Sequence, residues 1–283
     1  MLYETNEINA LVLAGGINRI TLFDGYKPGY KAVLPFCGKP LIEYTLAALK
    51  RSPEVKKICI VGPVEELKRT ITSADAVSYE FVNCGKTLIE NVCRGLMHFR
   101  ESPIVLVIPS DLPLATSEAI SAFLSLCSCI NTTYQANIFW SMVPEQDFTA
   151  RYTRVKKGFN RFKDLSICHG NLLLMTPSLL NNSRFITRID HIYQARKSSI
   201  RAAAAVGPGI GLTYLFGVHL FRRLTLSRFA QLASADFHVG LIPVLLHYPE
   251  IAVDIDEARD YRFVMEELNK RKQPEAGVTF QES

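Results

Sequence analysis

The sequence lacks the cysteine and glycine patterns that mark several common classes of protein. It contains no CxxC pair, and its seven cysteines are an odd number, which does not suit a framework of paired disulfides. Cys127, Cys129 and His169 offer metal ligands by type, but their spacing fits no recognised zinc pattern. Neither GxGxxG nor a Walker A loop (GxxxxGKS or GxxxxGKT) occurs, which argues against a dinucleotide-binding dehydrogenase and a P-loop enzyme. We therefore expect reduced thiols in a cytoplasmic protein.

An excess of charge of one sign is also missing. The formal net charge is only +5 over 283 residues. The one basic cluster runs from Arg151 to Lys163 and is interrupted by Tyr152 and Phe159. A nucleic-acid-binding face needs a denser basic stripe, so we expect no nucleic-acid partner. The cluster is either a solvated hairpin or an anion-binding lip.

Membrane segments and export signals are not expected either. Charged residues make up 21% of the sequence and are spread along most of it. Residues Met1 to Glu7 contain two acids and no basic residue, unlike the start of a signal peptide. We expect a protein with no membrane partner.

Strand-like and helix-like segments alternate in the first half of the chain. Apolar runs without polar alternation indicate strands buried on both faces, at Ala10–Leu13, Lys57–Val61, Ser78–Val82 and Ile104–Ile108. Helical patterns lie between them, at Leu41–Lys50, Glu65–Thr72 and Leu88–Phe99. This order predicts an α/β fold with a mostly parallel, Rossmann-like sheet and helices on both faces.

The second half predicts additions to this sheet. We expect strands at Ala136–Val143, at 155–174 with turns at Lys157-Gly158 and His169-Gly170, at Phe237–His247 and at Ile251–Ile255. Helices are expected from Pro177 to about Arg223 and from Glu257 to Lys270. The prediction is one domain, 1–272, divided into parts at about 1–130, 131–235 and 236–272, with a smaller mixed sheet and a helical insertion at about 177–235. A disordered tail, 273–283, is expected to follow.

The first strand ends in Ala14-Gly15-Gly16, followed by a loop with Arg19, Lys27 and Lys31. Ligands of parallel sheets bind beyond the carboxyl ends of the strands. Glycines let the backbone approach anionic oxygens closely, and lysine or arginine neutralises phosphate. The loop therefore suits phosphate binding, and a plain strand exit with solvated cations is the alternative.

Four motifs, in this order, resemble those of the MobA-like nucleotidyltransferases, a family of GT-A-type α/β enzymes. They are Leu13-Ala14-Gly15-Gly16 with Lys31 and Leu34-Pro35-Phe36-Cys37-Gly38-Lys39-Pro40-Leu41, then Cys84–Asn91, Ile108–Leu114 and Val253–Tyr261. Together they cover about the first 115 residues and the last 30. Two departures stand out: Arg19 comes one position earlier than in the family's GGxGxR pattern, and the loop to Lys31 is longer, so that Lys27 could replace Arg19.

The resemblance implies a role for each matching residue. Lys31, Asp111 and Arg19 would be catalytic, and Asp111 with Asp256 and Asp254 would hold Mg²⁺ or Mn²⁺. The nucleotide would contact Leu13, Ala14, Gly15, Gly16, Asn83, Gly85, Lys86, Thr87 and Ser110. Structural alternatives are that Asp111 caps the helical segment near Thr116, that Asp256 caps the helix at Glu257, and that Lys31 is a surface lysine.

The implied reaction joins an NTP to a phosphorylated small-molecule acceptor, such as a sugar or polyol phosphate, and releases pyrophosphate. We expect CTP as the donor, with GTP next. Acceptor contacts are expected from Tyr152, Arg154, Arg161, Lys163 and Asn171, and a homodimer is compatible with the sequence. The alternatives are a GT-A glycosyltransferase, although Ser110-Asp111-Leu112 lacks a DxD motif, and a non-catalytic nucleotide-binding protein, which the altered loop favours.

Overall fold

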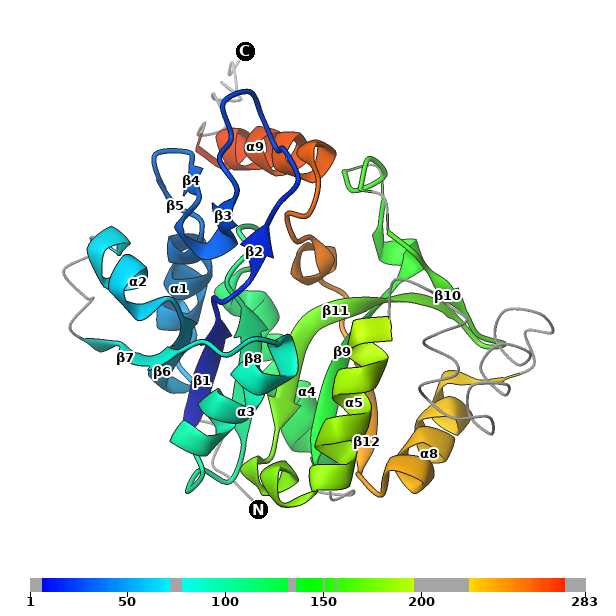
Figure 1. Cartoon of the computed structure of the whole chain (residues 1–283). Helices are drawn as coiled ribbons and strands as arrows, with labels where there is room; N and C mark the ends of the chain where they lie inside the picture. The colour runs from blue at the N-terminus through cyan, green and yellow to red at the C-terminus, as the bar shows by residue number, and fades with distance from the viewer. Residues whose placement is uncertain are drawn as a thin grey trace, which may run out of the picture.

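The computed structural model describes residues 7–71, 78–131, 136–149, 151–155, 157–195 and 224–272. Its centre is an eight-stranded sheet, with β10 paired to β11 beside the main path of seven strands (Figure 1). Across that path the order is β12 (Leu241–Leu245), β9 (Ile138–Pro144), β11 (Ser166–Met175), β8 (Val105–Pro109), β1 (Ile8–Leu13), β6 (Val55–Gly62) and β7 (Glu80–Asn83). β10 is Asn160–Arg161.

The strand directions confirm the predicted sheet. β8, β1, β6 and β7 pair in parallel, as do β12 and β9, whereas β11 runs antiparallel to both β8 and β9. The strands expected to form a smaller sheet continue the central one instead, because β11 pairs directly with β8.

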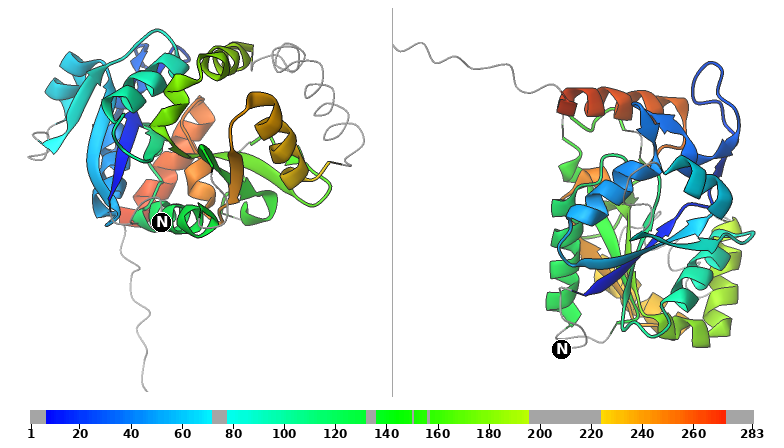
Figure 2. Two further views of the ribbon diagram at one scale, coloured as in Figure 1. Left: turned by 90° about the horizontal axis from the view of Figure 1, so that it is seen from below. Right: turned by 90° about the vertical axis from the view of Figure 1, so that its left-hand side faces the viewer.

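Helices cover both faces of the sheet, as Figure 2 shows. They are α1 (Ile42–Arg51), α2 (Val64–Thr70), α3 (Leu88–His98), α4 (Ser117–Asn131), α5 (Ser183–Ala195), α8 (Leu226–Phe237) and α9 (Ala258–Lys272). On β1, Ala10 and Val12 pack in one core with Phe123 of α4, while Leu11 packs in another with Leu96 of α3. Burial on both faces explains why the strand sequence is continuously apolar.

Two small antiparallel sheets follow the first strand. β2 (Ile17–Asn18) pairs with β3 (Gly29–Tyr30), and β4 (Pro35–Phe36) pairs with β5 (Lys39–Pro40). The short 3-10 helix η1 (Lys31–Val33) lies between them. Figure 1 shows these segments beside α9, which shares a third core with Phe36 and Leu41.

Two predicted elements in the second half are wrong. Residues 251–255 form no strand: the 3-10 helix η6 (Pro249–Ala252) is followed by irregular chain up to α9. The side chain of Ile251 packs closely against Gly170 of β11. A Cβ atom built at Gly170 would lie only 2.6 Å from Cδ1 of Ile251. The chain does not turn at His169-Gly170 either, since β11 continues through it with a register irregularity. Gly170 permits close approach to Ser141 of β9, whose Oγ would lie 2.4 Å from such a Cβ.

The predicted helical stretch after Pro177 is partly described. It begins with η4 (Pro177–Asn181) and α5, and α8 forms its far end. Phe237 ends α8 and does not begin a strand, because His238 adopts a left-handed conformation (φ 52) that terminates the helix. The rest of the insertion, 196–223, and the tail, 273–283, lie outside the described residues.

No helix in the described ranges is long and apolar enough to cross a membrane. That finding does not extend to 196–223, where the sequence from 202 to 221 contains no Asp, Glu, Lys or Arg.

Candidate functional site

The candidate site lies at the carboxyl ends of the neighbouring strands β1 and β8. The Ser110 N–H donates to the carbonyl of Leu13 (3.1 Å), which continues the pairing of the two strands by one residue. The next residue, Asp111, is only 8% exposed. The helix-cap alternative for Asp111 is wrong, because the hydroxyl of Thr116 accepts from the N–H of Ala119 at the start of α4.

Lys31 reaches this carboxylate from the segment after β3. Its backbone N–H donates to the carbonyl of Gly16 (2.9 Å), which ties η1 to the glycine pair. Its Nζ lies 2.9 Å from Oδ2 of Asp111 and also forms an ion pair with Asp256. Lys31 is therefore a half-buried part of the site and no surface lysine.

The protonation states follow from this arrangement. Burial alone would lower the pKa of Lys31, but the carboxylates of Asp111 and Asp256 outweigh burial and raise it above its ordinary value. Burial raises the pKa of Asp111 in spite of Lys31. For Asp256 the attraction of Lys31 outweighs burial and lowers the pKa. At neutral pH the lysine is thus held as an ammonium between carboxylates.

Three carboxylates meet at this point. Oxygen atoms of Asp111, Asp254 and Asp256 all lie within 4.8 Å of one another. Asp256 does not cap α9, since the side chain of Asp260 accepts from the N–H groups of Asp256 and Glu257 (3.2 and 2.8 Å). Hard divalent cations prefer carboxylate oxygens, so the three residues fit a Mg²⁺ or Mn²⁺ ion. We name Lys31 and these three aspartates the carboxylate cluster.

A second lysine, which the sequence patterns did not single out, joins the cluster. Nζ of Lys157 lies 2.5 Å from Oδ1 of Asp254, across 97 positions of the sequence. Nothing local in the sequence distinguishes Lys157 from other members of the basic cluster, so only the ion pair identifies it.

The two glycines after β1 differ in whether the surrounding structure has room for a side chain. A Cβ at Gly15 would lie 2.6 Å from Nδ2 of Asn91 and 3.0 Å from Cβ of Cys84, so a side chain is excluded by packing against α3. A Cβ at Gly16 would meet nothing within 4 Å. Neither glycine has a positive φ. Gly16 therefore leaves open space beside Lys31, whereas Gly15 is required because its neighbours leave no room for a side chain.

The segment from 83 to 90 lies beside Gly15 and is tied to the first turn of α3. The Gly85 N–H donates to Oδ1 of Asn91 (2.6 Å), and the Lys86 N–H donates to Oε2 of Glu90 (2.7 Å). The Thr87 hydroxyl accepts from the N–H of Glu90 (3.1 Å) and caps the helix. The hydrogen bond from Lys86, followed by that from Arg94, lowers the pKa of Glu90.

The remaining predicted nucleotide contacts line the same strand ends. Leu13 is half-buried at the end of β1, and the N–H of the buried Ala14 donates to the carbonyl of Val61 (2.7 Å). The Asn83 carbonyl accepts from Nη1 of Arg94 (3.0 Å). Arg19 is exposed on the loop between β2 and β3, outside the carboxylate cluster.

The predicted acceptor residues lie on several elements and have different partners. Tyr152 is buried, with its ring 5.9 Å from that of Phe263, and Arg154 pairs with Glu266 of α9. Asn171 donates to the carbonyl of Ile251 (2.9 Å) and holds η6 against β11. Arg161 and Lys163 are exposed on and just after β10. Tyr152 and Asn171 thus have structural roles that were not anticipated.

The strand-end site and the order of its motifs can be compared with known proteins. A family model described as the MobA-like NTP transferase domain matches residues 10–205. The chain belongs to the MobA-like NTP transferase family. This confirms the expected fold class and the resemblance to the family, and the match includes the first three of the four motifs. A search of curated proteins finds no match.

Solved structures agree with this MobA-like fold. A hypothetical transferase from Thermus thermophilus is 26% identical with a TM-score of 0.70, covering 90% of this chain and 99% of its own. A 4-diphosphocytidyl-2C-methyl-D-erythritol synthase from Anaerococcus prevotii is 15% identical with a TM-score of 0.54, covering 95% and 98%. A CMP:2-keto-3-deoxy-manno-octonic acid synthetase complexed with CTP is 11% identical with a TM-score of 0.55, covering 94% and 99%.

Proposed function

We propose that this member of the family is a metal-dependent nucleotidyltransferase that joins an NTP to a phosphorylated small-molecule acceptor. The observation that supports this most directly is the carboxylate cluster, in which one ammonium and three carboxylates from three segments of the chain meet at the strand ends beside Gly16. Such a combination suits a reaction that moves highly charged phosphates.

The proposed step is a displacement at phosphorus. An oxygen of the acceptor's phosphate bonds to the α-phosphorus of the NTP, the bond between that phosphorus and the bridging oxygen to the β-phosphorus breaks, and pyrophosphate leaves with the electron pair. Lys31 neutralises phosphate charge, because its raised pKa keeps it an ammonium. The protein supplies position and charge, and no covalent enzyme intermediate is needed.

Asp111, Asp254 and Asp256 would hold Mg²⁺ or Mn²⁺. When bound, the ion would neutralise charge on the triphosphate. In the structure Lys31 forms an ion pair with Asp111, and Lys157 forms one with Asp254. If these carboxylates bound a metal ion instead, both lysines would be free to pair with phosphate. Arg19 and Lys27 are exposed on the neighbouring loop, from which they would contact the phosphates.

The choice of donor and acceptor is the finer part of the proposal. CTP is favoured over GTP because the names of two compared structures refer to cytidylyl products or to bound CTP. A sugar or polyol phosphate suits the acceptor side, where Lys157, Arg161 and Lys163 provide cations. Tyr152, Arg154 and Asn171 support this side through their contacts with Phe263, Glu266 and Ile251.

The test is pyrophosphate release with Mg²⁺, using ATP, CTP, GTP and UTP separately with a pool of phosphomonoesters. We expect release with CTP that depends on the pool and is lost in Asp111→Asn. Asp236→Asn, which alters an aspartate paired with Arg188 away from the cluster, is the matched control. Thermal stabilisation by CTP without release under any condition would contradict the proposal and favour a non-catalytic nucleotide-binding protein.

A further inference from the structure

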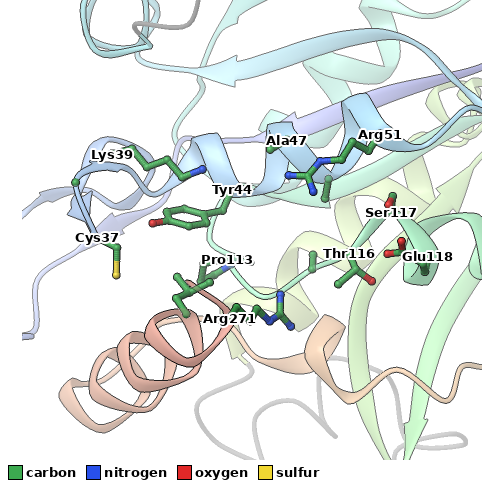
Figure 3. A pocket seen from close by; sticks show the side chains of 14 residues that line it. Cys37, Lys39, Tyr44, Ala47, Arg51, Pro113, Thr116, Ser117, Glu118 and Arg271 are labelled. Atoms are coloured by element: carbon green, nitrogen blue, oxygen red, sulfur yellow. The ribbon is translucent and has the colours of Figure 1, made fainter. Parts of the chain in front are cut away.

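A cavity of about 490 Å³ lies between α1 and α9, outside the carboxylate cluster (Figure 3). Its walls are these two helices, the β4–β5 turn, and the chain from Pro113 to the start of α4. Its volume falls within the range of pockets that hold small molecules. Neither the glycine pair nor any residue of the carboxylate cluster lines it.

The charge of the cavity is one-sided. Three cationic side chains line it, Lys39, Arg51 and Arg271, against a single carboxylate, Glu118. In Figure 3, Arg51 extends from α1 and Arg271 from α9 toward the space between the helices. Two guanidinium groups on facing walls suit an anion that can accept hydrogen bonds from both sides.

Two acids attract the cations from a distance: Glu118 attracts Arg51, and Glu250, which does not line the cavity, attracts Arg271. Within the described ranges, no ion pair involves Lys39, Arg51 or Arg271. The hydrogen bond from the Glu118 backbone N–H contributes most to lowering the pKa of its carboxylate, and Arg51 contributes least. Arg271 donates to the carbonyl of Leu114 (3.2 Å), which fixes its position, and its positive charge acts to lower the pKa of the half-buried Glu250 against the effect of burial.

The rest of the lining suits the organic part of a ligand. Pro113, Ala47 and Leu268 provide apolar surface, and the ring of Tyr44 lies 4.0 Å from Nζ of Lys39. We propose that this cavity is a second ligand site, which binds a small molecule bearing a phosphomonoester. The site is separate from the proposed NTP site and does not rest on the proposed function.

The test is calorimetric titration with glycerol 3-phosphate, without NTP or metal, so that binding is measured independently of turnover. We expect saturable binding that Arg51→Gln combined with Arg271→Gln weakens by about tenfold or more, because two charge-assisted contacts are lost. Arg51→Gln alone, which leaves the bond from Arg271 to Leu114 intact, is expected to weaken binding less.

Two controls separate this cavity from other anion sites. Arg100→Gln removes an exposed arginine outside the cavity, and Lys31→Met removes the lysine of the carboxylate cluster. Both variants are expected to bind like the wild type. An absence of binding to the wild type would overturn the proposal. So would binding that is lost in Lys31→Met but kept in the double arginine variant, because the probe would then occupy the cluster.

Discussion

The ammonium of Lys31 lies 2.9 Å from the carboxylate of Asp111, although 80 positions separate the two residues in the chain. The same ammonium pairs with Asp256, which lies 225 positions away. One lysine thus connects the start, the middle and the end of the sequence. It also balances carboxylates that would otherwise repel one another.

Replacement of Lys31 and of Asp111 should have different effects on stability. Lys31→Met leaves the buried carboxylate without its partner, and we expect a loss of about 3 kcal/mol in the free energy of unfolding. Asp111→Asn removes a charge from a group of three acids and should leave stability unchanged or higher. Both should lower the rate of pyrophosphate release by at least ~10²-fold.

Urea unfolding with and without Mg²⁺ measures the first part of this prediction. Mg²⁺ should stabilise Lys31→Met more than the wild type, since the ion no longer competes with the lysine for Asp111 and Asp256. Lys31→Arg, which keeps the charge, should recover most of the lost stability. An Asp111→Asn protein as unstable as Lys31→Met would contradict the electrostatic account.

The two glycines after β1 should respond differently to alanine. Gly15→Ala places a methyl group 2.6 Å from Asn91 Nδ2, so the first turn of α3 must shift and the thermal midpoint should fall by several degrees. Gly16→Ala meets open space and should keep the midpoint. If the nucleotide approaches Gly16, this variant should still raise the KM for the NTP. Equal midpoints for the two variants would be the contrary result.

Lys157 offers a test of the acceptor side. In Lys157→Met, the partner of Asp254 is lost, and we expect the KM for the acceptor to rise by about tenfold, with a smaller change in the KM for the NTP. Lys56→Met, at an exposed lysine paired with Glu7, is the matched control. A fall in kcat with both KM values unchanged would instead make Lys157 a positioning residue for Asp254.

Glu267 gives a pH-dependent contribution to stability. Its carboxylate is 2% exposed, with Lys270 at 2.8 Å and Arg151 at 2.5 Å. Burial acts to raise its pKa, but Lys270 and Arg151 outweigh burial and lower it. The carboxylate therefore adds stability above the ordinary glutamate pKa of about 4.3, and this is lost as the pH falls through the lower folded value.

Glu267→Gln should accordingly destabilise the protein by about 1–2 kcal/mol at pH 7. The difference from the wild type should shrink when urea unfolding is repeated below about pH 4. Glu101→Gln, at an exposed residue beside Arg100, should change little at either pH. A difference for Glu267→Gln that does not depend on pH would show that lost packing, and no loss of charge, is the cause.

The central strands were predictable because a continuous apolar run of this length is best explained by a strand buried on both faces. Continuous apolar runs such as Ala10–Leu13 are stable in water only when both faces are covered. The run at Ile251–Ile255 has similar composition and failed as a strand prediction. Pro249 begins a 3-10 helix that includes Ile251. The side chain of Ile251 packs against Gly170 of β11, and the segment does not pair with that strand as part of the sheet.

The same distinction holds for the candidate site. The spacing of Lys31 from Gly38 and the position of Asp111 after an apolar strand could be predicted from local sequence. The role of Thr87 as a helix cap was also open to prediction, because Thr87 and Glu90 form the local T-x-x-E pattern of a capping box. The role of Tyr152 as a core residue could not be predicted, because it depends on the groups that surround it in space. The proposed division of the chain at about residues 130 and 235 stays a prediction.

By itself, the sequence determined the alternation of strands and helices, the glycine pair at the end of the first strand, and the order of the motifs. These depend on hydrophobic periodicity and on residue types within a few positions of one another. Only the tertiary structure decided that Lys157 meets Asp254, that Lys31 lies between two carboxylates, and that Arg51 and Arg271 face one cavity. Electrostatic contacts depend on distances in space, and the packing of the whole sheet against its helices fixes those distances.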